Sequence, residues 1–117
     1  MQDKPSPELL IAEVRKALAE GLAPGFSQKV AANALGIAER ELNLSPASSA
    51  AEDARLETLV GSQGDLADRN RRLAEKLRNP DSAVSDAMVE HLILTTLAKI
   101  EVDQPGYAPF LAWRDSE

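Results

Sequence analysis

The apolar residues of this chain recur at helical spacing in several separate stretches. Leu10, Val14 and Leu18 follow one another every four residues, up to Gly21. A stripe of small and branched side chains then repeats every three or four residues between positions 26 and 43. This period places apolar side chains on one face of a helix, whereas a half-buried strand would alternate every second residue. The pattern therefore predicts a chain built from amphipathic helices.

Helix start and stop residues set the expected bounds. Ser6-Pro7 combines a capping hydroxyl with a proline at the first helical position, and Asp65 with Asp68 caps a later helix. Asn79-Pro80 ends that later helix, because proline cannot continue it. The predicted helices cover about residues 7–20, 26–43, 47–60, 65–79 and 82–102, followed by a tail over 105–117.

Two of these starts stay open. The third helix begins either at Ser45-Pro46 or at the capping box from Ser49 to Glu52, and the fifth begins at Asp81 or Ser82. The fifth helix is apolar around most of its circumference, which is typical of a central helix. Gly61-Ser-Gln-Gly64 is expected to be a tight turn between two helices.

Composition supports an all-α fold. Aromatic residues are only 3 % of the 117 residues, and the commonest residues are Ala and Leu, which lead the helix propensity scale. A chain of this length corresponds to about one domain. We therefore predict a single domain over residues 1–117, folded as a compact bundle of about five helices with an aromatic C-terminal tail.

Charge and chemistry exclude several function classes. The chain has 13 basic and 19 acidic residues, a net charge of −6, which disfavours nucleic acid and anionic membranes as partners. It has no cysteine and one histidine, so thiolate catalysis and multi-histidine metal centres are excluded, although a site made of carboxylates alone is not. No apolar run is long enough to cross a membrane, and the N-terminus has no export pattern. We expect a bacterial cytoplasmic protein without a metal or cofactor.

Three of the four aromatic residues lie after Pro105-Gly106. Tyr107, Phe110 and Trp113 together would form an apolar patch that a monomer seldom exposes. The tail is therefore expected either to fold back over the bundle or to dock on another subunit. These three residues form a candidate interface.

Polar residues interrupt the apolar helices at two places. Asn33 and Arg40 are two turns apart on one helix, and His91, Thr95 and Lys99 form a slowly drifting line on another. If the two lines face each other, they form a polar cluster inside the bundle, made of Asn33, Arg40, His91, Thr95 and Lys99. We expect either a hydrogen-bond network that sets helix register, a Lys99–Asp103 pair at the surface, or a ligand pocket. Catalysis is the weakest reading, because no partner for the histidine is apparent from the sequence.

The fourth predicted helix is basic within an acidic chain. Its positive side chains are Arg69, Arg71, Arg72, Lys76 and Arg78. A helix with one narrow apolar edge usually carries charged residues on its solvent-facing side. We therefore interpret these residues as a solvated face. The alternative is a docking surface for an acidic partner or a ligand that bears phosphate.

Several motifs resemble a bacterial domain family of unknown function, over about residues 1–108. They are Val30-Ala-Ala-Asn33-Ala-Leu, Ala38-Glu-Arg40-Glu41-Leu42, Gly64-Asp65-Leu66 with Asn70 and Leu73, His91-Leu92, Leu97-Ala-Lys99 and Asp103-Gln-Pro105-Gly-Tyr107. Members are short proteins often encoded beside aminoglycoside-phosphotransferase-like kinases and acyl-CoA dehydrogenases. The resemblance implies no established reaction. It implies a helper or binding role near such enzymes.

Together these observations favour a non-catalytic accessory or protein-interaction module, associated through the resemblance with acyl-CoA or phosphotransferase metabolism. Its expected partner is another protein or a second copy of the chain. The rival hypothesis is a small-molecule-binding protein or small enzyme that uses the polar cluster. The sequence identifies neither the ligand nor the partner.

Overall fold

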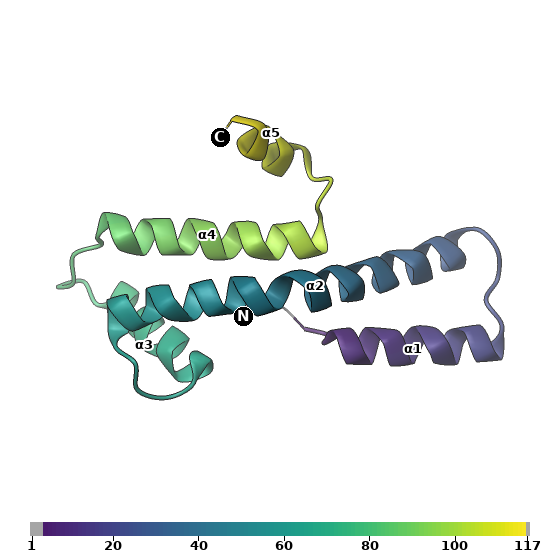
Figure 1. Cartoon of the computed structure of the whole chain (residues 1–117), viewed down its shortest axis with the longest axis horizontal. Helices are drawn as coiled ribbons and strands as arrows, with labels where there is room; N and C mark the ends of the chain where they lie inside the picture. The colour runs from purple at the N-terminus through teal and green to yellow at the C-terminus, as the bar shows by residue number, and fades with distance from the viewer. Residues whose placement is uncertain (1–3, 117) are drawn as a thin grey trace. The chain divides into compact units, whose positions relative to one another are not determined.

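The computed structural model describes residues 4–116, so residues 1–3 and 117 of the predicted domain and tail lie outside the described residues. Residues 4–116 form helices and contain no β-strand, which confirms the all-α prediction (Figure 1). The five helices are α1 (Pro7–Glu20), α2 (Phe26–Val60), α3 (Leu66–Arg78), α4 (Asp86–Asp103) and α5 (Ala108–Ser116).

Local capping determines where α1 and α3 begin. The Ser6 hydroxyl accepts a hydrogen bond from the Leu9 backbone N–H at 3.3 Å, with Pro7 as the first residue of α1. At α3, the Asp68 N–H donates to Asp65 Oδ1 at 2.8 Å, and the Asp65 N–H donates to Asp68 Oδ2 at 3.2 Å. This reciprocal capping box satisfies backbone donors that a helix start leaves without partners. Both predicted caps are confirmed.

The two helices predicted over 26–43 and 47–60 are one continuous helix, α2, and that prediction was wrong. Pro46 lies inside it, where it removes a backbone hydrogen bond and crowds the preceding turn at a cost of about 3 kcal/mol. Each half of α2 is held by its own packing, since Ala38 is 1 % exposed and Leu56 is 0 % exposed. Burial on both sides of the proline therefore outweighs the local preference for a break.

The fourth helix, α4, begins later than the sequence predicts. The Ser85 hydroxyl accepts from the Met88 N–H at 3.2 Å, so Ser85 caps the helix in place of Asp81 or Ser82. The Asp81 N–H instead donates to Asn79 Oδ1 at 3.0 Å. This local side-chain hydrogen bond keeps the segment after Asn79 in a turn rather than in a helix.

The predicted tail is largely a helix, which is a second correction. Residues 104–107 form a turn in which the Tyr107 N–H donates to the Gln104 carbonyl at 3.0 Å. Helix α5 follows, and Pro109 is tolerated there because the first turn of a helix needs no donor at that position.

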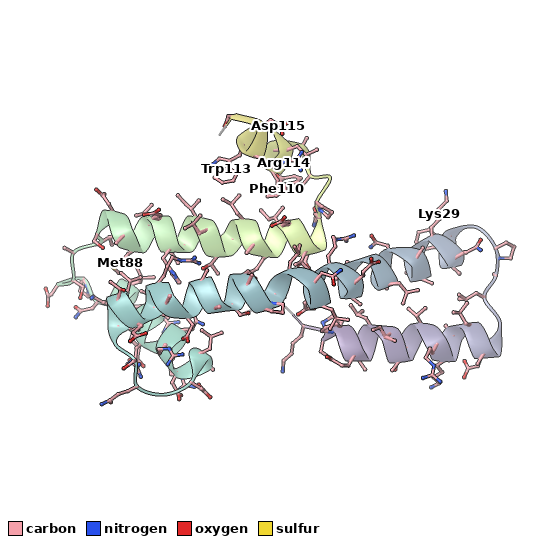
Figure 2. The ribbon with its side chains drawn as sticks, in the orientation of Figure 1. Lys29, Met88, Phe110, Trp113, Arg114 and Asp115 are labelled. Carbon is pink, nitrogen blue, oxygen red and sulfur yellow. The ribbon has the colours of Figure 1, made fainter. Side chains whose placement is uncertain are left out.

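The chain divides into two compact units, which we describe separately. The α3 unit comprises residues 47–98: the C-terminal part of α2, all of α3 and most of α4. Its segments of α2 and α4 run antiparallel (Figure 1). Leu56, Leu73 and Met88 form its buried core, one residue from each helix, and Met88 projects from α4 toward α2 (Figure 2).

The α1–α5 unit comprises the described residues 4–46 and 99–116. Here α1 and the N-terminal part of α2 run antiparallel side by side (Figure 1). The buried apolar side chains of this unit are Pro7, Val14, Ala38, Val102 and Phe110. That residues 1–117 form a single domain stays a prediction.

Candidate functional site

A polar pocket of about 780 Å³ opens in the α1–α5 unit. It lies where the N-terminal part of α2 meets the end of α4 and the turn that follows it. The residues that line it are Asn33, Ile37, Arg40, Asp103, Gln104, Pro105, Gly106 and Tyr107. Three of the sequence motifs that carried the family resemblance, two on α2 and one at 103–107, therefore come together here.

Arg40 is an anchored polar side chain of this pocket. Its Nε donates to the Val102 backbone carbonyl at 2.7 Å. That carbonyl belongs to the last turn of α4, where carbonyls lack partners within the helix. This last turn contains no basic residue of its own. A positive side chain is favourable at the negative end of the helix dipole. Arg40 thus caps α4 and holds its guanidinium beside the pocket.

Gly36 provides the room for this guanidinium. A Cβ atom at position 36 would lie 3.1 Å from Arg40 Nη1, which is tight for such a contact. A glycine inside a helix costs up to about 1 kcal/mol relative to alanine. Here the missing side chain lets Arg40 fold back along the preceding turn of α2.

The five residues of the predicted polar cluster are distributed over both units. Asn33 and Arg40 line the pocket of the α1–α5 unit, and Lys99 belongs to the same unit, one turn before Asp103 on α4. His91 and Thr95 belong to the α3 unit. In that unit they are connected by a residue that sequence reasoning missed, Arg55.

Arg55 bridges α2 and α4. Its Nε donates to His91 Nδ1 at 3.0 Å, and its Nη2 donates to the Thr95 hydroxyl at 3.2 Å. His91 is 1 % exposed, and Glu52, one turn before Leu56 on α2, is also buried. Positions 52 and 56 are one turn apart, so they lie on the same core-facing side of α2. A charged residue on that side was the available sequence indication of a buried polar network.

The buried histidine is held in its neutral form. Burial lowers the pKa of His91 below 6.5, and the positive charge of Arg55 lowers it further. Because Nδ1 accepts the hydrogen bond from Arg55, the proton of the neutral ring is assigned to Nε2. This network joins two helices of the α3 unit, which is what a register-setting network does.

The basic side chains of α3 mostly bind backbone carbonyls near the end of α2. Lys76 Nζ donates to the Leu59 carbonyl at 3.4 Å, and Arg69 Nη1 donates to the Ser62 and Gly64 carbonyls at 3.1 and 2.6 Å. Arg72 also donates to the Gln63 carbonyl, and Arg69 forms an ion pair with Asp53. These three cations close the 61–64 turn and supply the positive charge that the last turn of α2 lacks.

The three C-terminal aromatic residues have different surroundings. Phe110 is 7 % exposed, whereas Tyr107 and Trp113 remain 48 % and 40 % exposed. Tyr107 lines the polar pocket, and Figure 2 shows Phe110 and Trp113 on α5. Burial of Phe110 agrees with a segment that folds back, while the role of the other two as an interface stays a prediction.

A second cavity in the α1–α5 unit is an apolar groove of about 330 Å³ between α1 and the start of α2. Its walls are Leu10, Val14, Ala17 and Leu22 on one side and Phe26, Val30, Ala31 and Ala34 on the other, with Glu13 and Ser27 among them. Phe26 is 83 % exposed and Val30 is 50 % exposed. Sequence reasoning placed no site in this groove.

Residues 4–116 contain neither a cluster of potential metal ligands nor a helix that could span a membrane. No group of three or more acidic or histidine side chains in that range could hold a metal ion. No helix in that range is both long enough and apolar enough to cross a membrane.

Comparison with known proteins places the chain in a family. The family model described as "Domain of unknown function (DUF6285)" matches residues 16–107, most of the chain. Neither a curated protein nor a solved structure matches significantly. The matched range includes both walls of the polar pocket and the whole α3 unit. The chain therefore belongs to the DUF6285 family.

Proposed function

We propose that this protein is a non-catalytic interaction module, and that the groove between α1 and α2 binds an amphipathic helix of another protein. The observation that carries the proposal is the apolar groove with Phe26 at its edge, 83 % exposed. A soluble protein seldom leaves a phenylalanine ring open beside an apolar groove unless something covers it. Two antiparallel helices offer ridges and grooves into which a third helix packs.

Charge favours a different protein over a second copy of this chain. Glu13 is the one charged residue among those that line the groove, and the whole chain carries a net charge of −6. Two copies would bring like charges together, whereas a helix with an apolar stripe and a flanking Lys or Arg would complement both features. From the family resemblance we retain, as part of this proposal, an accessory role near acyl-CoA or phosphotransferase enzymes.

Site-specific cross-linking tests the proposal. A photo-reactive amino acid replaces Phe26 in one variant and Leu18 in a matched control, since Leu18 is 59 % exposed on α1 and does not line the groove. In the native cell, position 26 should cross-link to a segment of another protein that has helical apolar spacing and a basic residue. Cross-links to a second copy, or to a segment without an apolar stripe, would contradict the proposal.

A peptide with the sequence of that cross-linked segment then provides an affinity measurement. Binding should weaken at least about tenfold for Phe26→Ser, as is common for an aromatic residue covered by a partner, and should fall for Glu13→Gln. Leu18→Ser should leave the affinity unchanged. Because Phe26 and Leu18 are both exposed, neither substitution should lower the stability of the fold.

The second candidate function is small-molecule binding, and the polar pocket favours it. Asn33 and Arg40, which the sequence placed in one polar cluster, both line this pocket. A concave site with a few fixed polar groups is typical of ligand-binding proteins.

A further inference from the structure

We propose that the polar pocket of the α1–α5 unit binds a small organic carboxylate, held by the guanidinium group of Arg40. This inference specifies the ligand of the second candidate function and is independent of the groove between α1 and α2. It rests on three features of the pocket: an anchored guanidinium, a nearby acidic side chain, and neutral hydrogen-bonding groups around them.

The guanidinium of Arg40 is anchored before any ligand arrives. A guanidinium carries five N–H donors in a planar fork, and the Val102 carbonyl takes the donor on Nε. The two Nη groups present the geometry that binds both oxygens of a carboxylate. Since Nε is fixed at 2.7 Å from a buried helix end, little side-chain freedom remains to be lost on binding.

The surroundings favour a monoanion over a dianion. The Asp103 carboxylate lines the same pocket, and the C-terminal end of α4, with its partial negative charge, ends beside it. Both features oppose a doubly charged phosphate more strongly than a singly charged carboxylate. Asn33, Gln104 and Tyr107 add neutral groups suited to an amide or hydroxyl next to the carboxylate.

Titration with defined probes, followed by NMR of the full chain, tests the inference. N-acetylglycine supplies a carboxylate and an amide, its methyl ester lacks the charge, and inorganic phosphate supplies the dianion. The Arg40 Nε–H and the Gly106 backbone N–H should shift with saturation on N-acetylglycine. The ester and phosphate should bind roughly tenfold or more weakly, as expected for losing a hydrogen bond to a charged group.

A substitution at Gly36 separates binding from folding. Gly36→Ala places a methyl group 3.1 Å from Arg40 Nη1, so the guanidinium must shift by a few tenths of an ångström, while alanine is the better helix former. This variant should be at least as stable as the wild type and should bind N-acetylglycine more weakly. Arg40→Gln should abolish binding, and the matched control Arg15→Gln, an exposed site on α1, should leave it unchanged.

The outcomes distinguish this inference from the function on which it depends. Equal binding of N-acetylglycine and its ester, or tighter binding of phosphate, would overturn the carboxylate assignment and leave the pocket as a binding site for another ligand. Absence of saturable shifts with all three probes would overturn the carboxylate assignment together with the second candidate function. Unchanged affinity in the Arg40→Gln variant would refute the role given to Arg40.

Discussion

The buried histidine of the α3 unit should make folding stability depend on pH between about pH 7 and pH 5.5. His91 is 1 % exposed, and its Nδ1 accepts a hydrogen bond from Arg55 Nε at 3.0 Å. Protonating Nδ1 would remove that acceptor and place two positive charges together inside the unit. Burial, and then the charge of Arg55, lower the pKa of His91 from 6.5.

The sign and size of the effect follow from proton linkage. Because the folded pKa is the lower one, the unfolded chain takes up a proton as the pH falls below 6.5 while the folded chain does not. The contribution of neutral His91 to stability is complete above pH 6.5 and is lost as the pH falls toward the folded pKa. One proton limits the loss to about 1.4 kcal/mol of unfolding free energy per pH unit.

Urea unfolding followed by far-UV circular dichroism, repeated across this pH range, measures the loss. The chain has one histidine, so the difference in slope between the wild type and a variant without that histidine belongs to His91. His91→Asn keeps an acceptor near the Nδ1 position but cannot titrate, so its unfolding free energy should stay level. A wild-type free energy that stays constant down to pH 5.5, or that rises, would refute the argument.

Three further substitutions should change stability in stated directions, each measured by urea unfolding. Leu56→Ala should lower the free energy of unfolding by about 2–5 kcal/mol, because Leu56 is fully buried. Leu18 is 59 % exposed, so Leu18→Ala should lower it far less. Equal losses would contradict the assigned core. Pro46→Ala should raise stability by up to about 3 kcal/mol, because alanine restores the helix hydrogen bond. The gain is reduced because proline also lowers the entropy of the unfolded chain. A decrease in stability would show that α2 needs the proline. Phe110→Ala should lower the free energy of unfolding by about 3–5 kcal/mol, and Trp113→Ala should lower it less, because Phe110 is the more buried residue. The reverse order would contradict this difference in burial.

Features that depend on neighbouring residues could be predicted from the sequence. The capping box at Asp65 and Asp68 joins residues three apart, so it forms from local geometry and marks the start of α3. The same holds for Ser6 at α1. The start of α4 was misjudged because several residues between Asn79 and Ser85 are acceptable caps, and a choice among equivalent local signals depends on packing.

The candidate site could be predicted only in part. Asn33 and Arg40 were recognised as polar positions on one helix face, but their partners lie far away along the chain. Arg40 contacts Val102 across 62 residues, and Arg55 contacts His91 across 36. Helical periodicity identifies which face of a helix is polar, and it carries no information about which distant segment meets that face.

The sequence by itself determined the all-α class, the caps of α1 and α3 and the turn at 61–64, because propensity and capping act between residues a few positions apart. Only the tertiary structure decided that α2 continues through Pro46, because burial on both sides outweighs a local cost of about 3 kcal/mol. The tertiary structure also decided which cations cap α2 and α4. The end of each helix exposes carbonyls, and the residue that binds them is chosen by which side chain the fold brings within reach.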